Sequence, residues 1–380
     1  MKLDFDDLHD YVRGAAFLGA GGGGDPYIGR LLLRQEMEDG RTATIIDLDE
    51  LADDARVATV AAMGAPTVMI ERFPKIATLE TALETLQKRL GLKFDALIGA
   101  EAGGINGTLP LIAGARTGLP VVDGDGMGRA FPELQMVTYN IYGLSASPVI
   151  LVDDHNNRVI VEAGDNKTAE DFARAAIMAM HGEAQIALYA MTGAEPKRAA
   201  VPRTLLLALD IGRAIASARR SNSDPVVGLV DHLKNRADPR FAVELFHGKI
   251  VDLARETRAG FAFGRIRIEA IAGDAGVMDI AFQNENLEAR RDGELVAMVP
   301  DLICVLDSES AEPITTEGLK YGQRVRIVGV GVPPIMRSDP ALAVFGPQAF
   351  GIEADYRPIE ELFGQSPSRG ARQTCDDKGA

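Results

Sequence analysis

Carboxylate side chains follow two predicted strands within the glycine-rich stretch 99–136. Glu101 comes after the first strand, and Asp123 and Asp125 come at the end of the second. Because ligands of open α/β sheets bind at the carboxyl ends of strands, these acids are expected to meet in one site. Paired carboxylates suit general acid–base catalysis or a divalent cation, although Asp-x-Asp also occurs in ordinary turns and helix caps. The same loops carry further candidates for substrate contact: Asn106, Arg129 and Glu133.

A second candidate site is a run of four glycines: Gly21, Gly22, Gly23 and Gly24. With Gly19 the run matches the dinucleotide fingerprint G-x-G-x-x-G, but that fingerprint requires a preceding strand, and here an amphipathic helix precedes it. A P-loop is excluded because no Gly-Lys-Ser/Thr follows. The bare N–H groups instead suit an anion, a carbonyl or a developing oxyanion, and Asp25 is expected to cap the next helix. Tight packing of the two helices is the alternative.

The second half of the chain adds further candidates for substrate contact. Asn284 and Glu285 lie in AFQNENLEA (281–289), where polar residues interrupt an apolar strand. They are expected either to bond the edge of a planar heterocycle or to form a turn. His247 enters a strand beside Gly248 and is the one histidine retained as a candidate. Neither His-x-x-x-His nor HExxH spacing occurs, which disfavours a histidine-rich zinc site, and the absence of G-x-S-x-G disfavours a serine hydrolase.

The elements that carry these loops alternate between strands and helices over the first half of the chain. Short apolar runs predict buried strands, and apolar residues at helical spacing predict the helices between them. This order is typical of an N-terminal three-layer α/β domain, with a mainly parallel sheet and helices on both faces. The expected strands are 43–47 and 57–64, a strand that runs into a loop over 94–104, and a short strand followed by a glycine loop over 119–128. The expected helices are 6–18, 26–37, 78–90 and 108–118.

From about residue 244 the pattern changes to short strands separated by turns. This pattern predicts a β-rich C-terminal domain of barrel or sandwich type. We therefore expect an N-terminal α/β domain over 1–167 and a C-terminal domain over 168–365, whose helices precede its β-rich part. The last residues, 366–380, are expected to form a disordered tail.

Composition disfavours several classes of function. The chain of 380 residues carries 55 acidic and 40 basic side chains, and a net charge of −15 disfavours binding to nucleic acid or to an anionic membrane surface. No apolar run is long enough to span a bilayer. Cys304 and Cys375 are the only cysteines, so no disulfide framework is expected and a cytoplasmic location is the default. Apolar hairpin strands and small-residue helices predict a homo-oligomer.

Several of these motifs, in the same order, resemble the S-methyl-thiohydantoin desulfurase family, whose members are also described as hydantoin-utilisation-like. The resemblance covers about residues 5–360 and rests on GAGGGGDPYIG, AEAGGINGTLPL, VVDGDGMGRAFPELQM, FHGKIVD, FQNENL, VPDLICVLD and YGQRV. It implies a three-layer α/β domain followed by a β-rich domain. It also implies an enzyme that hydrolyses an S-methylated thiohydantoin ring to a hydantoin with release of a thiol, so the expected partner is a small heterocyclic substrate.

This reaction gives the candidate residues their expected roles. Water must add to the ring carbon that bears sulfur, and a base or a metal must activate that water. Glu101, Asp123 and Asp125 are the candidates, either directly or as ligands of a divalent Zn, Mg or Mn ion. The glycine loop is expected to stabilise developing charge, and Asn106 and Asn284 to hold the ring edge. Two alternatives stay open: another hydantoin-type ring hydrolase or hydantoinase-associated protein, and a non-catalytic small-molecule binding protein.

Overall fold

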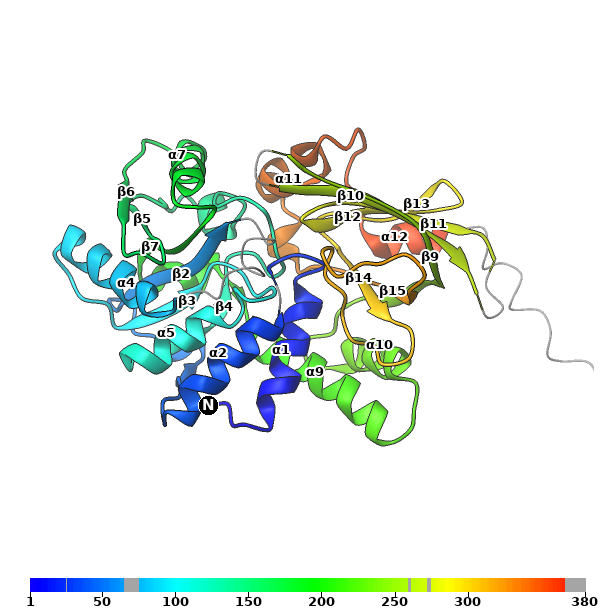
Figure 1. The fold of residues 1–380 in the computed structure, drawn as a ribbon, viewed down its shortest axis with the longest axis horizontal. Coiled ribbons are helices and arrows are strands. Elements are labelled where there is room, and N and C mark those ends of the chain that lie inside the picture. The colour runs from blue at the N-terminus through cyan, green and yellow to red at the C-terminus, as the bar shows by residue number, and fades with distance from the viewer. Residues whose placement is uncertain (25, 65–74, 259–260, 272–274, 366–380) are drawn as a thin grey trace, which may run out of the picture.

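An eight-stranded sheet lies at the centre of the N-terminal half (Figure 1). The computed structural model describes residues 1–24, 26–64, 75–258, 261–271 and 275–365. The strand order is β1-β4-β3-β2-β7-β5-β6, and β8 pairs with β4 outside this path. The strands are β1 (Ile45–Ile46), β2 (Arg56–Gly64), β3 (Ala96–Gly99), β4 (Val121–Asp125), β5 (Val149–Val152), β6 (Arg158–Val161), β7 (Glu183–Thr192) and β8 (Val201–Pro202). Asp25 and the predicted tail 366–380, with Cys375, lie outside the described residues.

Parallel and antiparallel pairs both occur in this sheet. Strands β1, β4, β3 and β2 pair in parallel, whereas β7, β5, β6 and β8 pair antiparallel with their neighbours. The α/β prediction is confirmed, but the sheet is mixed rather than mainly parallel. The reason is that a short apolar run has the same pattern in either direction, so its periodicity does not report strand direction. The carboxyl ends of β2, β3 and β4 still meet at one edge.

Helices cover both faces of the sheet. α4 and α5 contact each other and pack against one face, while α7 packs against the other (Figure 1). In α4, Leu79, Ala82, Leu83 and Leu86 recur at helical spacing and are all buried, which accounts for its docking. Within the described residues, no helix combines the length and apolarity that crossing a membrane requires. The longer helices are α1 (Asp7–Leu18), α2 (Pro26–Glu38), α4 (Ala77–Leu90), α5 (Leu109–Thr117), α7 (Asn166–Ala179), α9 (Thr204–Arg220) and α10 (Pro225–Asn235).

A seven-stranded antiparallel sheet forms the β-rich half, in the order β13-β12-β11-β10-β9-β15-β14. Met278, Ile280 and Phe282 of β11 are buried and alternate with half-buried residues, so one face of the sheet carries the apolar core. The sheet curls into a half-barrel, which confirms the β-rich prediction with an open rather than a closed barrel. The strands are β9 (Ala242–Arg258), β10 (Phe261–Ala270), β11 (Val277–Gln283), β12 (Glu285–Arg291), β13 (Glu294–Met298), β14 (Leu302–Asp307) and β15 (Arg324–Val330).

Shorter helices connect these layers. They are the α-helices α6 (Thr138–Ile141), α8 (Ala194–Ala199), α11 (Asp339–Phe345) and α12 (Ile359–Gln365), and the 3-10 helices η1 (Leu48–Glu50), η2 (Pro334–Met336) and η3 (Pro347–Phe350). The α6 helix contacts both α8 and α11, so segments far apart in the sequence lie side by side there.

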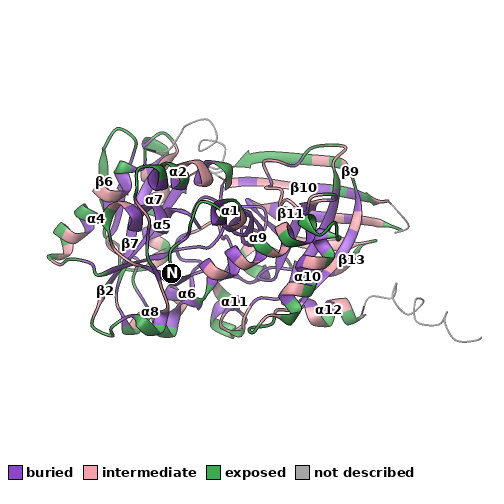
Figure 2. Cartoon of the chain, turned by 90° about the horizontal axis from the view of Figure 1, so that it is seen from below, coloured by how far each residue is buried: buried purple, intermediate pink, exposed green. Residues whose placement is uncertain are grey.

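Two glycines allow α1 and α9 to pack at backbone distance. Gly14 of α1 lies against Ala208, and Gly212 of α9 lies against Asp10, so that a Cβ at either glycine would lie 1.7 Å from a carbonyl oxygen. Figure 2 shows α1 among the buried segments near the middle of the molecule. This close contact holds the end of α1, and therefore the glycine loop that follows it, in place.

We expect Gly14→Ala to destabilise the fold by about 1–3 kcal/mol, because the added methyl group forces the two helices apart. The midpoint of urea unfolding measures this effect. Gly164→Ala is the matched control, since no described atom lies within 4 Å of the position its Cβ would take. Equal midpoints for the two variants would contradict the packing argument.

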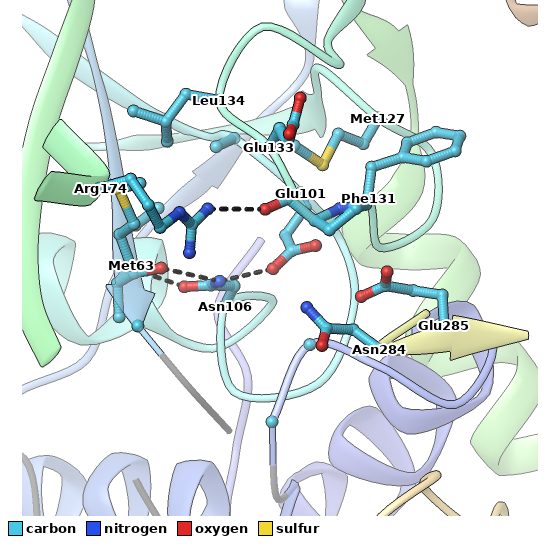
Figure 3. Close-up of a pocket in the computed structure, with 17 residues that line it drawn as sticks. Met63, Glu101, Asn106, Met127, Phe131, Glu133, Leu134, Arg174, Asn284 and Glu285 are labelled. Atoms are coloured by element: carbon cyan, nitrogen blue, oxygen red, sulfur yellow. Dashed lines mark hydrogen bonds between the residues drawn. The ribbon is translucent and has the colours of Figure 1, made fainter. Parts of the chain in front are cut away.

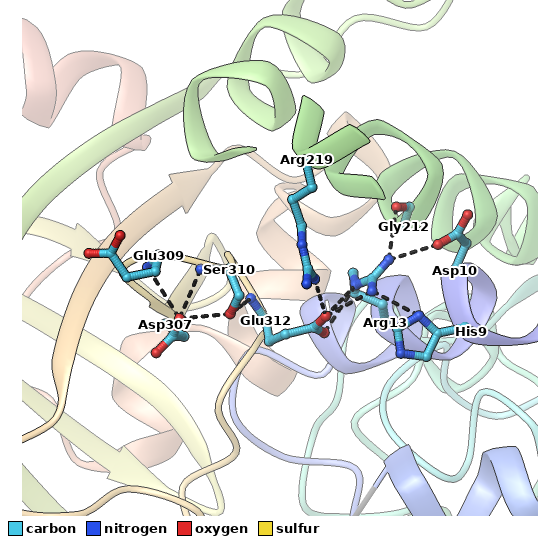
Figure 4. A network of polar contacts seen from close by, with 9 residues as sticks. All are labelled: His9, Asp10, Arg13, Gly212, Arg219, Asp307, Glu309, Ser310 and Glu312. Atoms are coloured by element: carbon cyan, nitrogen blue, oxygen red, sulfur yellow. Dashed lines mark hydrogen bonds and ion pairs between the residues drawn. The ribbon is translucent and has the colours of Figure 1, made fainter. Parts of the chain in front are cut away.

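A buried arginine joins α1 to the second sheet. The Arg13 guanidinium donates to Glu312, to Asp10 and to the carbonyl oxygen of Gly212 (Figure 4). Arg219 of α9 pairs with the same Glu312 carboxylate. Because Glu312 follows β14, this network links both helices to the second sheet.

Candidate functional site

A cleft of about 600 Å³, its open mouth included, lies where the carboxyl ends of β2, β3 and β4 meet the turn between β11 and β12. The glycine loop after α1 forms part of the wall, and Met127, Phe131 and Leu134 supply apolar surface. Both halves of the chain therefore contribute to one cavity. Figure 3 shows the polar side chains that line it: Glu101, Asn106, Glu133, Arg174, Asn284 and Glu285.

Asn106 holds Glu101 in this cleft. The Asn106 amide nitrogen donates to the Glu101 carboxylate and to the carbonyl oxygen of Ala62, the latter at 3.1 Å (Figure 3). The Ala62 N–H donates back to the Asn106 oxygen at 2.7 Å, so strand β2 fixes the orientation of the amide. The second Glu101 oxygen, Oε2, is buried and has no hydrogen-bond partner in the described part of the chain. A buried oxygen without a partner needs an explanation, and a proton or a ligand would supply one.

Asn284 forms the turn between β11 and β12, and Glu285 is the first residue of β12. Asn284 has a φ of +57°, a left-handed conformation that asparagine tolerates better than most residues. Its Oδ1 accepts from the Ala262 N–H at 2.8 Å, which leaves its amide nitrogen directed into the cleft (Figure 3). Glu285 is buried, and its Oε2 also lacks a partner among the described residues. The predicted turn is observed, and both side chains line the cleft.

Two of the four glycines line the cleft. Gly23 and Gly24 do so, and their N–H groups take part in none of the hydrogen bonds found among the described residues. Gly23 has a φ of +79°, and a Cβ there would lie 2.6 Å from the backbone of Gly103. Only glycine lets these two loops approach each other this closely.

The other two glycines make structural contacts. The Gly21 carbonyl accepts from the N–H of Thr316 at 2.8 Å, which joins the loop to the C-terminal half. A Cβ on Gly22 would lie 2.1 Å from Oε1 of Glu285, so this glycine makes room for the carboxyl group. The glycine run therefore allows close packing and also lines the cleft. A binding role and a packing role, the two alternatives expected from the sequence, can both apply.

Asp123 and Asp125 lie on β4 but not in the lining of the cleft. Oδ1 of Asp123 accepts from the N–H of Leu205 at 2.9 Å, in the first turn of α9. Oδ1 of Asp125 accepts from the N–H groups of Met127 at 2.5 Å and Gly128 at 2.6 Å. The two aspartates thus satisfy N–H groups of a helix start and of a tight loop, which is the alternative that Asp-x-Asp spacing left open. The structure does not bring them together with Glu101 in the cleft.

Arg129 lies behind the cleft rather than in it. Its side chain is fully buried and donates to the carbonyl oxygens of Asn286 at 3.0 Å and Asp301 at 2.9 Å. The guanidinium also lies 5.1 Å from the ring of Phe131, which lines the cleft. Arg129 therefore supports the wall of the cavity and connects it to the second sheet.

Of the last two residues predicted to contact substrate, one lines the cleft and the other does not. Glu133 lines the cleft and accepts a hydrogen bond from Gln135. His247 lies on β9 opposite Arg326 of β15 and does not line the cleft.

Two parts of the cleft were not anticipated from the sequence. Arg174 of α7 donates to the carbonyl oxygen of Pro132 at 2.9 Å and pairs with Glu170. The Glu170–Arg174 spacing is that of an ordinary helix-surface pair, so it gave no signal. The end of β2, residues 61–64, also lines the cleft. The rule that ligands bind at the carboxyl ends of strands would have pointed to this third strand.

The predicted metal ligands do not form one group. Within the described residues, the only three metal-ligating side chains that lie within 4.8 Å of one another are Asp153, Asp154 and His155, in the turn between β5 and β6. Glu101 and the two aspartates of β4 are not such a group, and each aspartate already bonds backbone N–H groups. These positions do not fit a shared divalent ion, so no step below is derived through a metal.

Burial dominates the electrostatics of the acids. It raises the pKa of Glu101 to about 8, while the hydrogen bond from Asn106 opposes that shift. Burial also raises the pKa of Glu285 well above its usual value, and the nearby Glu101 adds to the shift. The pKa values of Asp123 and Asp125 are each raised to about 6, again mainly by burial. Glu101 and Glu285 therefore form a coupled pair that retains a proton at neutral pH.

These shifts predict that the melting temperature falls as pH rises from 5 to 9. A carboxyl with a raised pKa stabilises the fold fully below its unfolded pKa of roughly 4, and this stabilisation is lost as pH passes the folded value. The loss builds up between the unfolded and the folded pKa, so it is complete near pH 6 for Asp123 and Asp125 and near pH 8 for Glu101. Thermal unfolding followed by circular dichroism measures it. Glu101→Gln should flatten the fall between about pH 6 and pH 8, where the aspartates no longer contribute, and a melting temperature that rises with pH would contradict the prediction.

Family models match nearly the whole chain. The model described as S-Me-THD-like, N-terminal domain matches residues 6–163, and the model described as S-Me-THD-like, C-terminal domain matches residues 164–359. No curated protein matches the chain. The X-ray crystal structure of a protein from Chromobacterium violaceum is similar, with a TM-score of 0.78 and 22% identity, over 94% of this chain and 100% of that chain. At that identity the likeness supports the fold alone.

Proposed function

The chain belongs to the S-Me-THD-like family, and we propose that it is an enzyme that hydrolyses the carbon–sulfur bond of an S-methylated thiohydantoin-type ring. Water would add to the ring carbon that bears sulfur, and the products would be a hydantoin-type carbonyl and a thiol. The oxygen comes from water and the oxidation state of the ring carbon does not change. The reaction therefore needs one group that takes up a proton and one that donates a proton.

The observation that carries the proposal is the pair of buried carboxyl groups, Glu101 and Glu285, in one cleft. Ionisation of one raises the pKa of the other, so the two groups lose their protons one after the other and not together. Asn106 donates a hydrogen bond to Glu101, which stabilises the ionised form at that position. Glu101 is therefore assigned as the base and Glu285 as the acid.

In the proposed reaction, ionised Glu101 takes a proton from water as the water oxygen bonds to the ring carbon. Protonated Glu285 donates its proton to the ring nitrogen, which receives the electron pair of the carbon–nitrogen double bond. The carbon–sulfur bond then breaks, and its electron pair leaves on sulfur. Glu101 returns its proton to the thiolate, while the new hydroxyl loses its proton to Glu285. Both acids end in their starting states, and one water is consumed for each thiol released.

The remaining groups of the cleft suit a small planar ring. The amide nitrogen of Asn284 and the N–H groups of Gly23 and Gly24 are donors for a ring oxygen that gains negative charge. The apolar side chains of Met127 and Phe131 suit the ring face and the methylthio group. This division of polar edge and apolar face supports a heterocycle as substrate.

Thiol release from S-methyl-thiohydantoin tests the proposal. We expect the purified chain to release methanethiol, detected with a thiol-reactive dye, and to incorporate oxygen from ¹⁸O-labelled water into the product carbonyl. Because only ionised Glu101 can accept the proton, kcat/KM should rise about tenfold per pH unit below the Glu101 pKa of about 8 and then level off.

The controls separate this proposal from its alternatives. Hydantoin, which has no carbon–sulfur bond, should release no thiol. Opening of the hydantoin ring without thiol release from the S-methyl compound would indicate another ring hydrolase. Binding of both compounds without any product would indicate a small-molecule binding protein. Either result would contradict the desulfurisation proposal.

A further inference from the structure

The outermost strand of the eight-stranded sheet has one open side. β6 ends the strand order and, among the described strands, pairs only with β5. It lies at the end of the molecule opposite the second sheet (Figure 1). Edge strands of natural proteins are commonly protected by proline, a bulge, short length or charged side chains. The short strand β6, with the sequence RVIV, has no proline and no bulge, and the charge of Arg158 is opposite in sign to that of the adjoining Glu162. Such an edge is a template for pairing with another strand.

The ladder with β5 determines which backbone groups of β6 are free. The Asp153 N–H donates to the carbonyl oxygen of Asn157 at 3.2 Å, so this pair is hydrogen-bonded. Hydrogen-bonded and non-hydrogen-bonded pairs alternate along an antiparallel ladder, which puts Arg158 and Ile160 at non-hydrogen-bonded positions. Their N–H and C=O groups therefore point away from β5. Glu162, two residues beyond Ile160, follows the same alternation, so its backbone groups are also expected to point away from β5.

We infer that β6 pairs with the same strand of a second copy of this chain, antiparallel and about a two-fold axis at Ile160. In this register Ile160 faces its own copy through outward N–H and C=O groups. Arg158 lies opposite Glu162 of the partner subunit. The two-fold axis generates a second, identical pair on the other side of Ile160. The side chains of Arg158, Ile160 and Glu162 alternate onto one face and are exposed, Ile160 by 45%. Opposite charges directly across a ladder stabilise it.

Charge and hydrogen bonding select this register over its neighbours. A two-fold axis at Arg158 would put two arginines opposite each other, and an axis at Glu162 would oppose two glutamates. An axis at Val159 or Val161 would use backbone groups that already bond β5. Only the axis at Ile160 combines free backbone groups with opposite charges.

Residues beside the strand are consistent with this interface. Arg89 of α4 pairs with Glu162, so the partner's Arg158 would join an existing ion pair. Helix α7 packs against β6 and carries two exposed apolar side chains, Phe172 at 55% and Met178 at 65% exposure. No residue of β6 lines the cleft.

Sedimentation equilibrium of the full chain tests the inference. We expect a dimer, and we expect Arg158→Glu or Glu162→Arg alone to raise its dissociation constant at least about tenfold, because each change opposes like charges twice. The double variant carrying both changes should restore the dissociation constant. Arg89→Gln is the matched control, since it removes the intrachain partner of Glu162 without changing the strand edge, and it should leave the dimer intact.

Ile160→Pro tests the backbone part of the interface. Proline removes the N–H that points outward and leaves the ladder with β5 complete, so this variant should be a folded monomer by circular dichroism and sedimentation. A wild-type chain that stays monomeric up to about 100 μM would overturn the inference. So would a dimer whose dissociation constant is unchanged in Ile160→Pro and in both charge variants.

Discussion

Replacing Glu101 with glutamine is expected to lower kcat/KM for thiol release by about 10²–10⁴-fold, the usual contribution of a general acid or base. The amide keeps the size of the carboxyl group, and its oxygen can still accept from Asn106, but it cannot take a proton from water. The activity that remains should lose the rise with pH that the Glu101 pKa of about 8 produces. Initial rates of thiol release between pH 6 and pH 9 measure both effects.

Asp123→Asn is the comparison that decides between the two carboxylate assignments. Asp123 is buried on the neighbouring strand but does not line the cleft, so its replacement should leave most of the activity. An asparagine oxygen can still accept from the first turn of α9, which keeps the variant folded. If both folded variants lost the same fraction of kcat/KM, the aspartates of β4 would again be candidates for the group that activates water. Full activity in Glu101→Gln would remove Glu101 from the mechanism.

Local elements were predictable because their signals are local. The helix expected at 78–90 is α4 (Ala77–Leu90), and the strand expected at 57–64 is β2 (Arg56–Gly64). Each has an apolar periodicity that neighbouring residues suffice to define. Strand direction is different, because it depends on partners far along the chain. The antiparallel pairing of β7 with β2 joins residues more than a hundred positions apart, and no property of either strand alone reports it.

Residues of the candidate site could be grouped from the sequence where they follow the same strand. They could not be grouped where segments far apart in the sequence meet only in the folded chain. Glu101 and Asn106 follow β3 in the same loop, so the rule for strand ends placed them together. The turn with Asn284 and Glu285 reaches the same cleft from the second sheet, and only the packed structure shows this. Asp125 has the same chemistry as Glu101 but bonds backbone N–H groups. The role of a carboxylate thus depends on what its oxygens contact, which residue type and spacing do not specify.

Arg129→Met is expected to lower the free energy of unfolding by about 3–5 kcal/mol. The side chain is 0% exposed and donates to the carbonyl oxygens of Asn286, Pro300 and Asp301, all from the C-terminal half of the chain. Methionine fills much of the same volume but leaves these buried oxygens without a donor. Because Arg129 follows β4, the lost bonds are ones that attach the first sheet to the second. Urea unfolding followed by circular dichroism measures the change.

The same substitution should also move the pH dependence of activity. Attraction to the Arg129 guanidinium opposes the effect of burial on the pKa of Glu101, so removing this charge should raise that pKa further. The rise of kcat/KM with pH would then shift to higher pH. Arg129→Lys separates the two effects, because lysine keeps the charge but cannot reach all three carbonyl oxygens.

Arg34→Met, which removes an exposed pair with Glu38, is the control for the loss of stability and should lower the free energy of unfolding by at most about 1 kcal/mol. Wild-type stability in Arg129→Met would mean that this arginine does not hold the two sheets together.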